Sequence, residues 1–383
     1  MNVLNRTVLA QTLDARFADD LSSGRISGAA ACIFQDGVCQ YERCVGVTAP
    51  GGNRPVTPRT VFRLASMTKP VTTVAVLLLA EQGKLHLDDP IEKYLPEFRN
   101  PRLVALDESG SLMDRGAITT KPTIFHLLTH TSGIGSGIVG AHPNAALPED
   151  AKRNLASAVS HYASLGLSFE PMTRHEYSPI ATFDLLASIV EKVSGEDFNA
   201  FLRRFIFDRC DMPDTTFVPN ADQWDRLITL HDYQDGHAAW ASSIEGCVFE
   251  DIPATRYLGG GGLVSTLTDY SHFAEMLLAR GAWKGQRVLG EKWVDLIGTP
   301  ALPATIQPGY KRWGLSVRVI VGGGYRSLPV GAYGWSGVYG THFWVDPANR
   351  ITAVYMRNSL YDGGFASRIA HHFEQDVTGA LEC

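Results

Sequence analysis

The stretch "FRLASMTKPVTTVAVLLLAEQGKL" (residues 62–85) joins a short polar segment to a long apolar run. Ser66 and Lys69 lie three positions apart at the predicted start of a helix, where side chains at i and i+3 share one face. Residues 70–80 are apolar on nearly every side for three turns, which is typical of a helix buried on all faces. The stretch therefore predicts a central helix with a serine and a lysine at its first turn.

Ser66 and Lys69 are residue types that can serve as a nucleophile and its base. Burial disfavours the charged ammonium of a lysine, so a buried Lys69 can accept a proton near neutral pH. At the start of a helix, backbone N–H groups and the positive end of the dipole favour anionic chemistry at Ser66. The alternative is a capping serine followed by a surface lysine, because a bare Ser-x-x-Lys pattern occurs by chance in many proteins.

The composition limits the class of protein. The chain has 383 residues, of which 45% are hydrophobic and 19% charged, as expected for a globular protein with a large core. A formal net charge of −6 offers no basic surface for nucleic acid or an anionic membrane. Six scattered cysteines without a Cys-x-x-Cys pair, and a start without an apolar signal region, predict a cytoplasmic protein with reduced thiols and no membrane partner.

Strand signals gather at both ends of the chain. Residues 28–47 read as two strands joined by an Asp-Gly turn, and further strands follow from about residue 312 before a final helix. Between them, short helical runs are broken by Pro, Gly and Asn. The pattern predicts an α/β protein of the α+β type, with an antiparallel sheet built from both termini and flanked by helices. Residues 1–85 with 251–383 form this part, and residues 86–250 form an inserted, mainly helical domain.

Tyr177 stands directly before a predicted helix start, with Ser178 as the N-cap and Pro179 at the first helical position. A tyrosine on such a loop can point into a cleft and carry a proton between a serine and a leaving group. A neighbouring lysine cation favours its phenolate form. The commoner outcome is a tyrosine that only packs against its surroundings.

A third element is "GAYGWSGVYG" (residues 331–340), in which glycines flank Trp335 and Ser336 at a predicted strand edge. Glycine there lets a ligand approach the backbone closely. The N–H of Val338, just past Gly337, can pair with that of Ser66 as an oxyanion hole. The alternative is a strand weakened by glycine and supported by aromatic packing.

The three elements in this order, Ser66-x-x-Lys69, Tyr177-Ser178 and Trp335-Ser336-Gly337, resemble the serine β-lactamase and penicillin-binding superfamily. The resemblance is closest to the class C-like carboxylesterases called family VIII. "HLLTHTSGI" (126–134) and "GGGGLVSTLTDYSHFAEMLL" (259–278) are similar to recurrent stretches of that family, and the likeness runs from about residue 25 to the C-terminus.

The resemblance implies a β-lactamase/transpeptidase-like fold with the site between the two parts. It implies that Ser66 is the acylated nucleophile, that Lys69 and Tyr177 form the base and proton relay, and that the N–H groups of Ser66 and Val338 hold the oxyanion. The reaction then passes through an acyl-enzyme, which water or another alcohol resolves. It requires neither a metal nor an organic cofactor.

Two departures from the β-lactamase pattern favour an esterase. Trp335 replaces the lysine of the usual Lys-Thr-Gly motif, which removes a charge-assisted contact to a substrate carboxylate worth about 1.5–3 kcal/mol. Its indole presents a flat apolar wall instead. Pro179 replaces the asparagine of the class C Tyr-x-Asn motif. Residues expected to contact the substrate are Trp335, Ser336, Gly337 and Tyr339.

The sequence therefore predicts a serine carboxylesterase for small, mostly uncharged esters, with acyl transfer to alcohols or amines as a second outcome. A β-lactamase or D-Ala-D-Ala peptidase is the alternative enzyme. A non-catalytic penicillin-sensing protein is the alternative from another class, against which the intact Ser66, Lys69 and Tyr177 argue.

Other motifs carry less chemistry. No serine lies in the Gly-x-Ser-x-Gly pattern of α/β-hydrolases. His126 and His130 lie four positions apart but lack the glutamate of a His-Glu-x-x-His zinc motif, so we predict structural histidines. The glycine run 259–262 lacks a phosphate-binding lysine, and we expect it to let the backbone pass close to the active-site wall.

Overall fold

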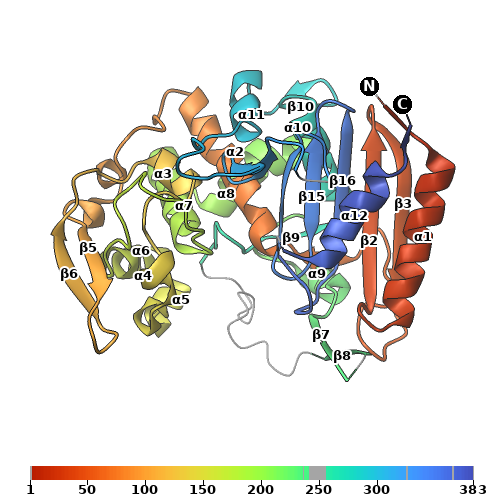
Figure 1. Ribbon diagram of the computed structural model, residues 1–383, viewed down its shortest axis with the longest axis horizontal. Coiled ribbons are helices and arrows are strands. Elements are labelled where there is room, and N and C mark those ends of the chain that lie inside the picture. The colour runs from red at the N-terminus through yellow and green to blue at the C-terminus, as the bar shows by residue number, and fades with distance from the viewer. Residues whose placement is uncertain (1, 236, 241–255, 325–326, 365, 383) are drawn as a thin grey trace.

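The computed structural model describes residues 2–235, 237–240, 256–324, 327–364 and 366–382 (Figure 1). Its largest sheet has seven strands in the order β12-β13-β14-β15-β16-β2-β3. Every neighbouring pair in it is antiparallel, and β16 joins β2, so the two ends of the chain meet inside one sheet. The predicted antiparallel sheet from both termini is therefore confirmed. Its strands are β2 (Gly28–Gln35), β3 (Val38–Gly46), β12 (Lys311–Trp313), β13 (Arg318–Ile320), β14 (Tyr333–Ser336), β15 (His342–Asp346) and β16 (Ile351–Met356).

Helices cover both faces of this sheet. Alternating residues of β2 separate the faces, because successive side chains of a strand point in opposite directions. Ala29 and Ala31 pack with α1 (Arg6–Ser22) and α12 (Arg368–Thr378), whereas Ala30 packs on the side of α10 (Leu267–Leu278). Beside α1 and α12, the short strands β1 (Val3–Leu4) and β17 (Leu381–Glu382) pair the two termini.

The helix α2 (Thr68–Glu81) lies between the sheet and the helical part (Figure 1). Every residue from Thr68 to Ala80 is buried, which confirms the predicted all-round burial. Its preceding 3₁₀ turn, η1 (Ala65–Met67), follows β4 (Val61–Arg63), which pairs with β9 (Val264–Thr266). The start of α2 is thus anchored to the sheet side, while its body packs against α7 (Ala181–Ser194).

The middle of the chain is mainly helical but includes two hairpins that the sequence did not predict. These are β5 (Arg102–Leu106) with β6 (Leu112–Ala117), and β7 (His231–Gln234) with β8 (His237–Trp240). The strand β6 is largely exposed and contains Asp, Arg and Gly, so it lacks the apolar alternation by which a strand is detected. Its hairpin is closed by the Asp107 carboxylate, which accepts from the N–H groups of Ser109 and Ser111.

The remaining elements are mostly short. The helices are α3 (Ile124–Leu128), α4 (Gly137–Ala141), α5 (Glu149–Arg153), α6 (Leu155–Ser164), α8 (Phe198–Leu202), α9 (Ala221–Arg226) and α11 (Glu291–Ile297). The 3₁₀ turns are η2 (Ile91–Lys93), η3 (Pro96–Phe98), η4 (Pro143–Ala145) and η6 (Asp208–Cys210), with a π-helical turn η5 (Arg203–Phe207). A last hairpin joins β10 (Ala282–Trp283) and β11 (Gln286–Arg287).

Residues late in the 86–250 segment contact the sheet part of the molecule. Thr216 forms a bridge with Val264, Leu227 one with Val61, and His231 one with Ser359. The expected boundary at residue 250 lies outside the described residues, so the division of the chain into two domains stays a prediction. Nowhere in the described ranges does a helix have both the length and the apolar character needed to cross a bilayer.

Candidate active site

Ser66 lies in a turn that is held from both sides. Ala65, just before it, has φ 48°, a left-handed conformation that alanine adopts only when its surroundings enforce it. The Thr341 hydroxyl donates to the carbonyl of Leu64 at 2.8 Å, and the Tyr270 hydroxyl donates to that of Met67 at 2.8 Å. These two bonds fix the backbone on either side of the serine.

Lys69 lies at the first turn of α2 and is completely buried. Its Nζ is 3.2 Å from Ser66 Oγ and 2.6 Å from each of two backbone carbonyl oxygens, those of Pro179 and Gly260. The alternative of a surface lysine is therefore wrong. A buried amine needs such partners because an unpaired polar group in a protein interior is costly.

The buried carboxylate on α7 does not pair with this lysine. Asp184 accepts from the Tyr162 hydroxyl at 3.0 Å and lies 3.3 Å from the guanidinium of Arg256. Burial raises the pKa of Asp184 to about 6. Within the described ranges, no carboxylate oxygen comes within 4.0 Å of Lys69 Nζ, so backbone carbonyls rather than an anion hold it.

Tyr177 lies above the lysine, on the loop that leads into α7. Lys69 Nζ is 5.1 Å from the centre of its ring, and Trp335 Nε1 donates to its hydroxyl at 3.3 Å. The sequence predicted a tyrosine on a loop before a helix, and the structure brings it to the Ser66–Lys69 pair. Three segments far apart in the chain thus meet at this point.

The predicted start of the following helix is wrong by a few residues. The helix begins at Ala181 with Ile180 as its N-cap, whereas the sequence placed the cap at Ser178 and the first turn at Pro179. The Ser178 hydroxyl still accepts from the Thr182 N–H at 3.4 Å, but the Ser178 N–H donates to His130 Nδ1 and the Pro179 carbonyl accepts from Lys69. Because these two residues are bound to the site, they are not free to begin the helix.

His130 is the structural histidine that supports the tyrosine loop. It is 1% exposed, its ring centre is 4.5 Å from that of Tyr177, and its Nδ1 accepts from the Ser178 N–H at 3.2 Å. Burial, with the neighbouring charge of Lys69, holds the pKa of His130 well below its ordinary value. A neutral imidazole therefore lies beneath the tyrosine.

Gly337 is required where β14 meets the Ser66 turn. A Cβ at this position would lie 2.3 Å from the carbonyl oxygen of Leu64 and 2.2 Å from Thr341 Oγ1, which is impossible without displacement. In the part of the chain that the structure describes, the N–H groups of Ser66 and Val338 have no backbone acceptor. Both residues line the same cavity, which is consistent with the predicted oxyanion hole.

A cavity of about 390 Å³ opens over these groups. Among the residues predicted for the site, Ser66, Tyr177, Trp335, Ser336, Val338 and Tyr339 line it. Lys69 lies beneath its wall, and Gly337 contributes through the close approach just described. The Ser336 hydroxyl is paired with His342 Nδ1 at 2.8 Å, so it already has a protein partner.

Several residues of the site were not predicted. Pro179 and Gly260 act through backbone carbonyls, while Gly363 packs so tightly on the peptide of Val338 that a Cβ would lie 1.7 Å from its oxygen. Every residue has a backbone carbonyl, so residue type does not reveal which carbonyls bind Lys69. Only the glycines in the sequence indicated that backbone would lie close to the site. The expectation that the 259–262 run passes along the active-site wall is confirmed, since Gly260 and Gly261 line the cavity.

The fold and the Ser-Lys-Tyr arrangement define a β-lactamase-like protein. Comparison with known proteins identifies its family. A family model described as beta-lactamase matches residues 13–376, so the chain belongs to the beta-lactamase family. It is 30% identical over 384 residues to Esterase EstB of Burkholderia gladioli, across 94% of this chain and 93% of that protein. It is also 30% identical over 280 residues to a lovastatin esterase of Penicillium rubens, across 70% and 68% of the two chains.

Solved structures share the fold. EstCE1, described as a hydrolase with promiscuous acyltransferase activity, matches with a TM-score of 0.79 at 24% identity, across 97% of this chain and 99% of that chain. A family VIII carboxylesterase matches with a TM-score of 0.77 at 16% identity, across 98% of both chains. The family and fold class inferred from the sequence motifs are thus confirmed.

Gly337→Ala should cost about 10²-fold in kcat, because the new Cβ must push β14 away from the Ser66 turn by a large fraction of an ångström. Steady-state hydrolysis of a p-nitrophenyl ester measures this loss. Gly323→Ala is the matched control, since nothing lies within 4 Å of its Cβ position. Equal activity of the two variants would contradict the close approach.

Acid should destabilise the protein through His130. An unfolded histidine takes up a proton near pH 6.5, while the folded His130 stays neutral well below that value. The unfolded state then binds more protons as the pH falls, so the free energy of unfolding decreases by up to about 1.4 kcal/mol for each pH unit below 6.5.

Urea unfolding of the wild type and of His130→Gln between about pH 7 and pH 5 measures this slope. The remaining histidines contribute equally to both proteins, so the difference between the slopes isolates His130. We expect the shallower slope in the variant. Identical slopes would show that His130 titrates alike in the folded and unfolded states.

Proposed function

We propose that this chain is a serine carboxylesterase that hydrolyses small, mostly uncharged esters through an acyl-Ser66 intermediate. One observation carries the proposal: a fully buried Lys69, held by two carbonyls, lies 3.2 Å from the oxygen of Ser66. Transfer of the acyl group to an alcohol or amine is the second outcome of the same intermediate. The family membership and the esterases among the relatives support it.

The proposed mechanism needs Lys69 as a neutral amine when it accepts the proton of Ser66. An ammonium has three N–H donors and no acceptor, whereas a neutral amine has two donors and one lone pair. The carbonyls of Pro179 and Gly260 accept two of its N–H groups, and Nζ also lies 3.2 Å from Ser66 Oγ, the contact across which the amine would accept the serine proton. Ser66 then attacks the ester carbonyl carbon while its proton passes to Lys69.

The developing oxyanion is bound by the free N–H groups of Ser66 and Val338. Backbone donors of this kind are already oriented, so they stabilise the tetrahedral intermediate without reorganisation. Tyr177 delivers a proton to the leaving alcohol and regains one from the protonated Lys69, and the tyrosine oxygen accepts from Trp335 Nε1–H at 3.3 Å. Collapse of the intermediate gives acyl-Ser66, which a water molecule or an added alcohol releases by the same steps in reverse.

The walls of the cavity favour uncharged substrates. The described residues that line it include no Asp, Glu, Lys or Arg, and its wall contains the apolar side chains of Ile180, Trp335 and Val338. Tyr339 closes the wall by packing against Ala65 and Leu230. A substrate carboxylate would lose its hydration here without gaining a cation. This favours an esterase over a β-lactamase or D-Ala-D-Ala peptidase.

Ser66→Ala should reduce hydrolysis of p-nitrophenyl butyrate by about 10³-fold or more, because the acyl-enzyme cannot form. A chromogenic cephalosporin, tested beside it, should be cleaved slowly or not at all by the wild type. Ser164→Ala, an exposed serine on α6, is the matched control. Ester turnover that survives Ser66→Ala would overturn the mechanism, and rapid cephalosporin cleavage would overturn the substrate class. A wild type that is acylated once without turnover would instead be a penicillin-sensing protein.

Trp335→Lys restores the cation of the usual third motif and should change the charge preference. A contact worth about 1.5–3 kcal/mol raises the cephalosporin-to-ester ratio of kcat/KM by about 10- to 150-fold. Trp335→Phe is the control, since it keeps an aromatic wall but removes the N–H that Tyr177 accepts. It should lower both rates and leave their ratio unchanged. A ratio that shifts equally in both variants would contradict the role of charge.

A further inference from the structure

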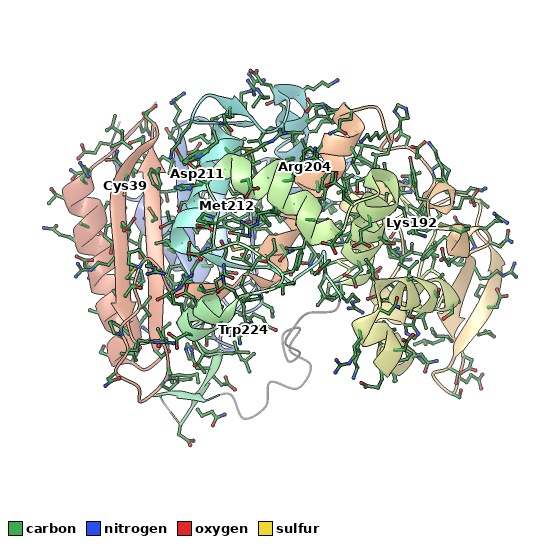
Figure 2. The ribbon with its side chains drawn as sticks, turned by 180° about the vertical axis from the view of Figure 1, so that it is seen from behind. Cys39, Lys192, Arg204, Asp211, Met212 and Trp224 are labelled. Carbon is green, nitrogen blue, oxygen red and sulfur yellow. The ribbon has the colours of Figure 1, made fainter. Side chains whose placement is uncertain are left out.

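The hairpin formed by β2 and β3 contains a cluster of thiols that has no part in the proposed ester chemistry. Cys32 lies on β2, and Cys39 and Glu42 lie on β3, the edge strand of the seven-stranded sheet. Figure 2 shows Cys39 at the end of the molecule that is remote from the helical part. Cys32 is buried, Cys39 is half-buried and Glu42 is exposed.

The three donor atoms are spaced as ligands of one ion. Cys32 Sγ lies 3.9 Å from Cys39 Sγ and 4.0 Å from Glu42 Oε2, and all three lie within 4.8 Å of one another. In a tetrahedral zinc site, with Zn–S of about 2.3 Å and Zn–O of about 2.0 Å, two sulfurs lie about 3.8 Å apart and a sulfur and an oxygen about 3.5 Å. The two distances from Cys32 Sγ exceed these values by only about 0.1 and 0.5 Å.

A β-bulge places the three side chains on one face of the hairpin. Cys32 is opposite Glu42 and Phe34 is opposite Cys39, but the register shifts between Ile33 and Phe34. In a regular strand, residues 39 and 42 would point to opposite faces, since side chains alternate. The extra residue in β3 cancels this alternation. Bulges that re-aim side chains in this way are commonly functional features.

The chemistry of the two thiols suits a metal ion. The hydrogen bond from Cys32 lowers the pKa of Cys39 to about 7, whereas that bond and burial raise the pKa of Cys32. Metal ions bind the thiolate form of cysteine, so binding of a cation displaces the protons of the thiols. The exposed Glu42 and half-buried Cys39 leave a path from solvent.

We propose that Cys32, Cys39 and Glu42 form a binding site for a thiophilic divalent cation of the Zn²⁺ class, with water as the fourth ligand. Two thiolates with one carboxylate are a donor set for such ions rather than for Mg²⁺ or Ca²⁺, which prefer oxygen ligands. A bound ion would link the edge strand β3 to β2. It would stabilise the hairpin without taking part in ester turnover.

Cobalt titration of the reduced protein tests the site, because Co²⁺ accepts the same ligands and its bonds to thiolates give a charge-transfer absorption. The wild type should bind one Co²⁺ with this band, and Zn²⁺ should displace it. Cys39→Ser should abolish the band and weaken binding by at least about 100-fold, since loss of a mere outer-shell partner already costs about 10- to 100-fold. Glu42→Gln should weaken binding but keep the band.

Cys44→Ser is the matched control, because Cys44 lies on the same strand but outside the cluster. It should bind cobalt as the wild type does, and p-nitrophenyl butyrate turnover should be unchanged in every variant. Absence of the band in reduced wild type, or a Cys39→Ser protein that binds equally well, would overturn the site. So would loss of binding in Cys44→Ser. If Cys39→Ser does not fold, the surface change Glu42→Gln decides alone: unchanged affinity overturns the donor set.

Discussion

The burial of one amine determines how the two parts of this molecule join. Lys69 lies on a helix that is buried on every side, and its Nζ needs hydrogen-bond partners in a place that water does not reach. The partners come from two other segments, the Pro179 carbonyl before α7 and the Gly260 carbonyl before β9. The helical part and the sheet part must therefore approach α2 at the same point, which is the candidate active site.

The need to supply these carbonyls explains details that otherwise look irregular. The helix α7 begins at Ala181 because the peptide before it is bound to Lys69 and His130. Gly259 lies so close to α7 that a Cβ would be 2.3 Å from the carbonyl oxygen of Phe183. Glycine allows a similarly close approach at β14, where Gly337 lets the strand contact the Ser66 turn. In each case backbone contact, rather than side-chain packing, sets the geometry.

The contrast between side-chain groups and backbone groups also explains which parts of the site could be predicted from the sequence. The residues that act through side chains, Ser66, Lys69, Tyr177 and Trp335, have a recognisable spacing and order, and the structure brings them together. The two carbonyl groups and the contact at Gly363 have no signature in residue type. The helix start at Ala181 was misplaced for the same reason, since tertiary hydrogen bonds overrode the local capping signals of Ser178 and Pro179. The exposed hairpin β5–β6 was missed because its strands lack an apolar face.

The replacement of a lysine by Trp335 has a consequence beyond substrate choice. Here the Tyr177 oxygen accepts from an indole N–H, which has only a partial charge, and the indole stands where the usual third motif has a lysine. Lys69 Nζ lies 5.1 Å from the centre of the Tyr177 ring. In the proposed mechanism, the substitution that removes the carboxylate contact therefore also leaves the proton relay with one buried amine, Lys69.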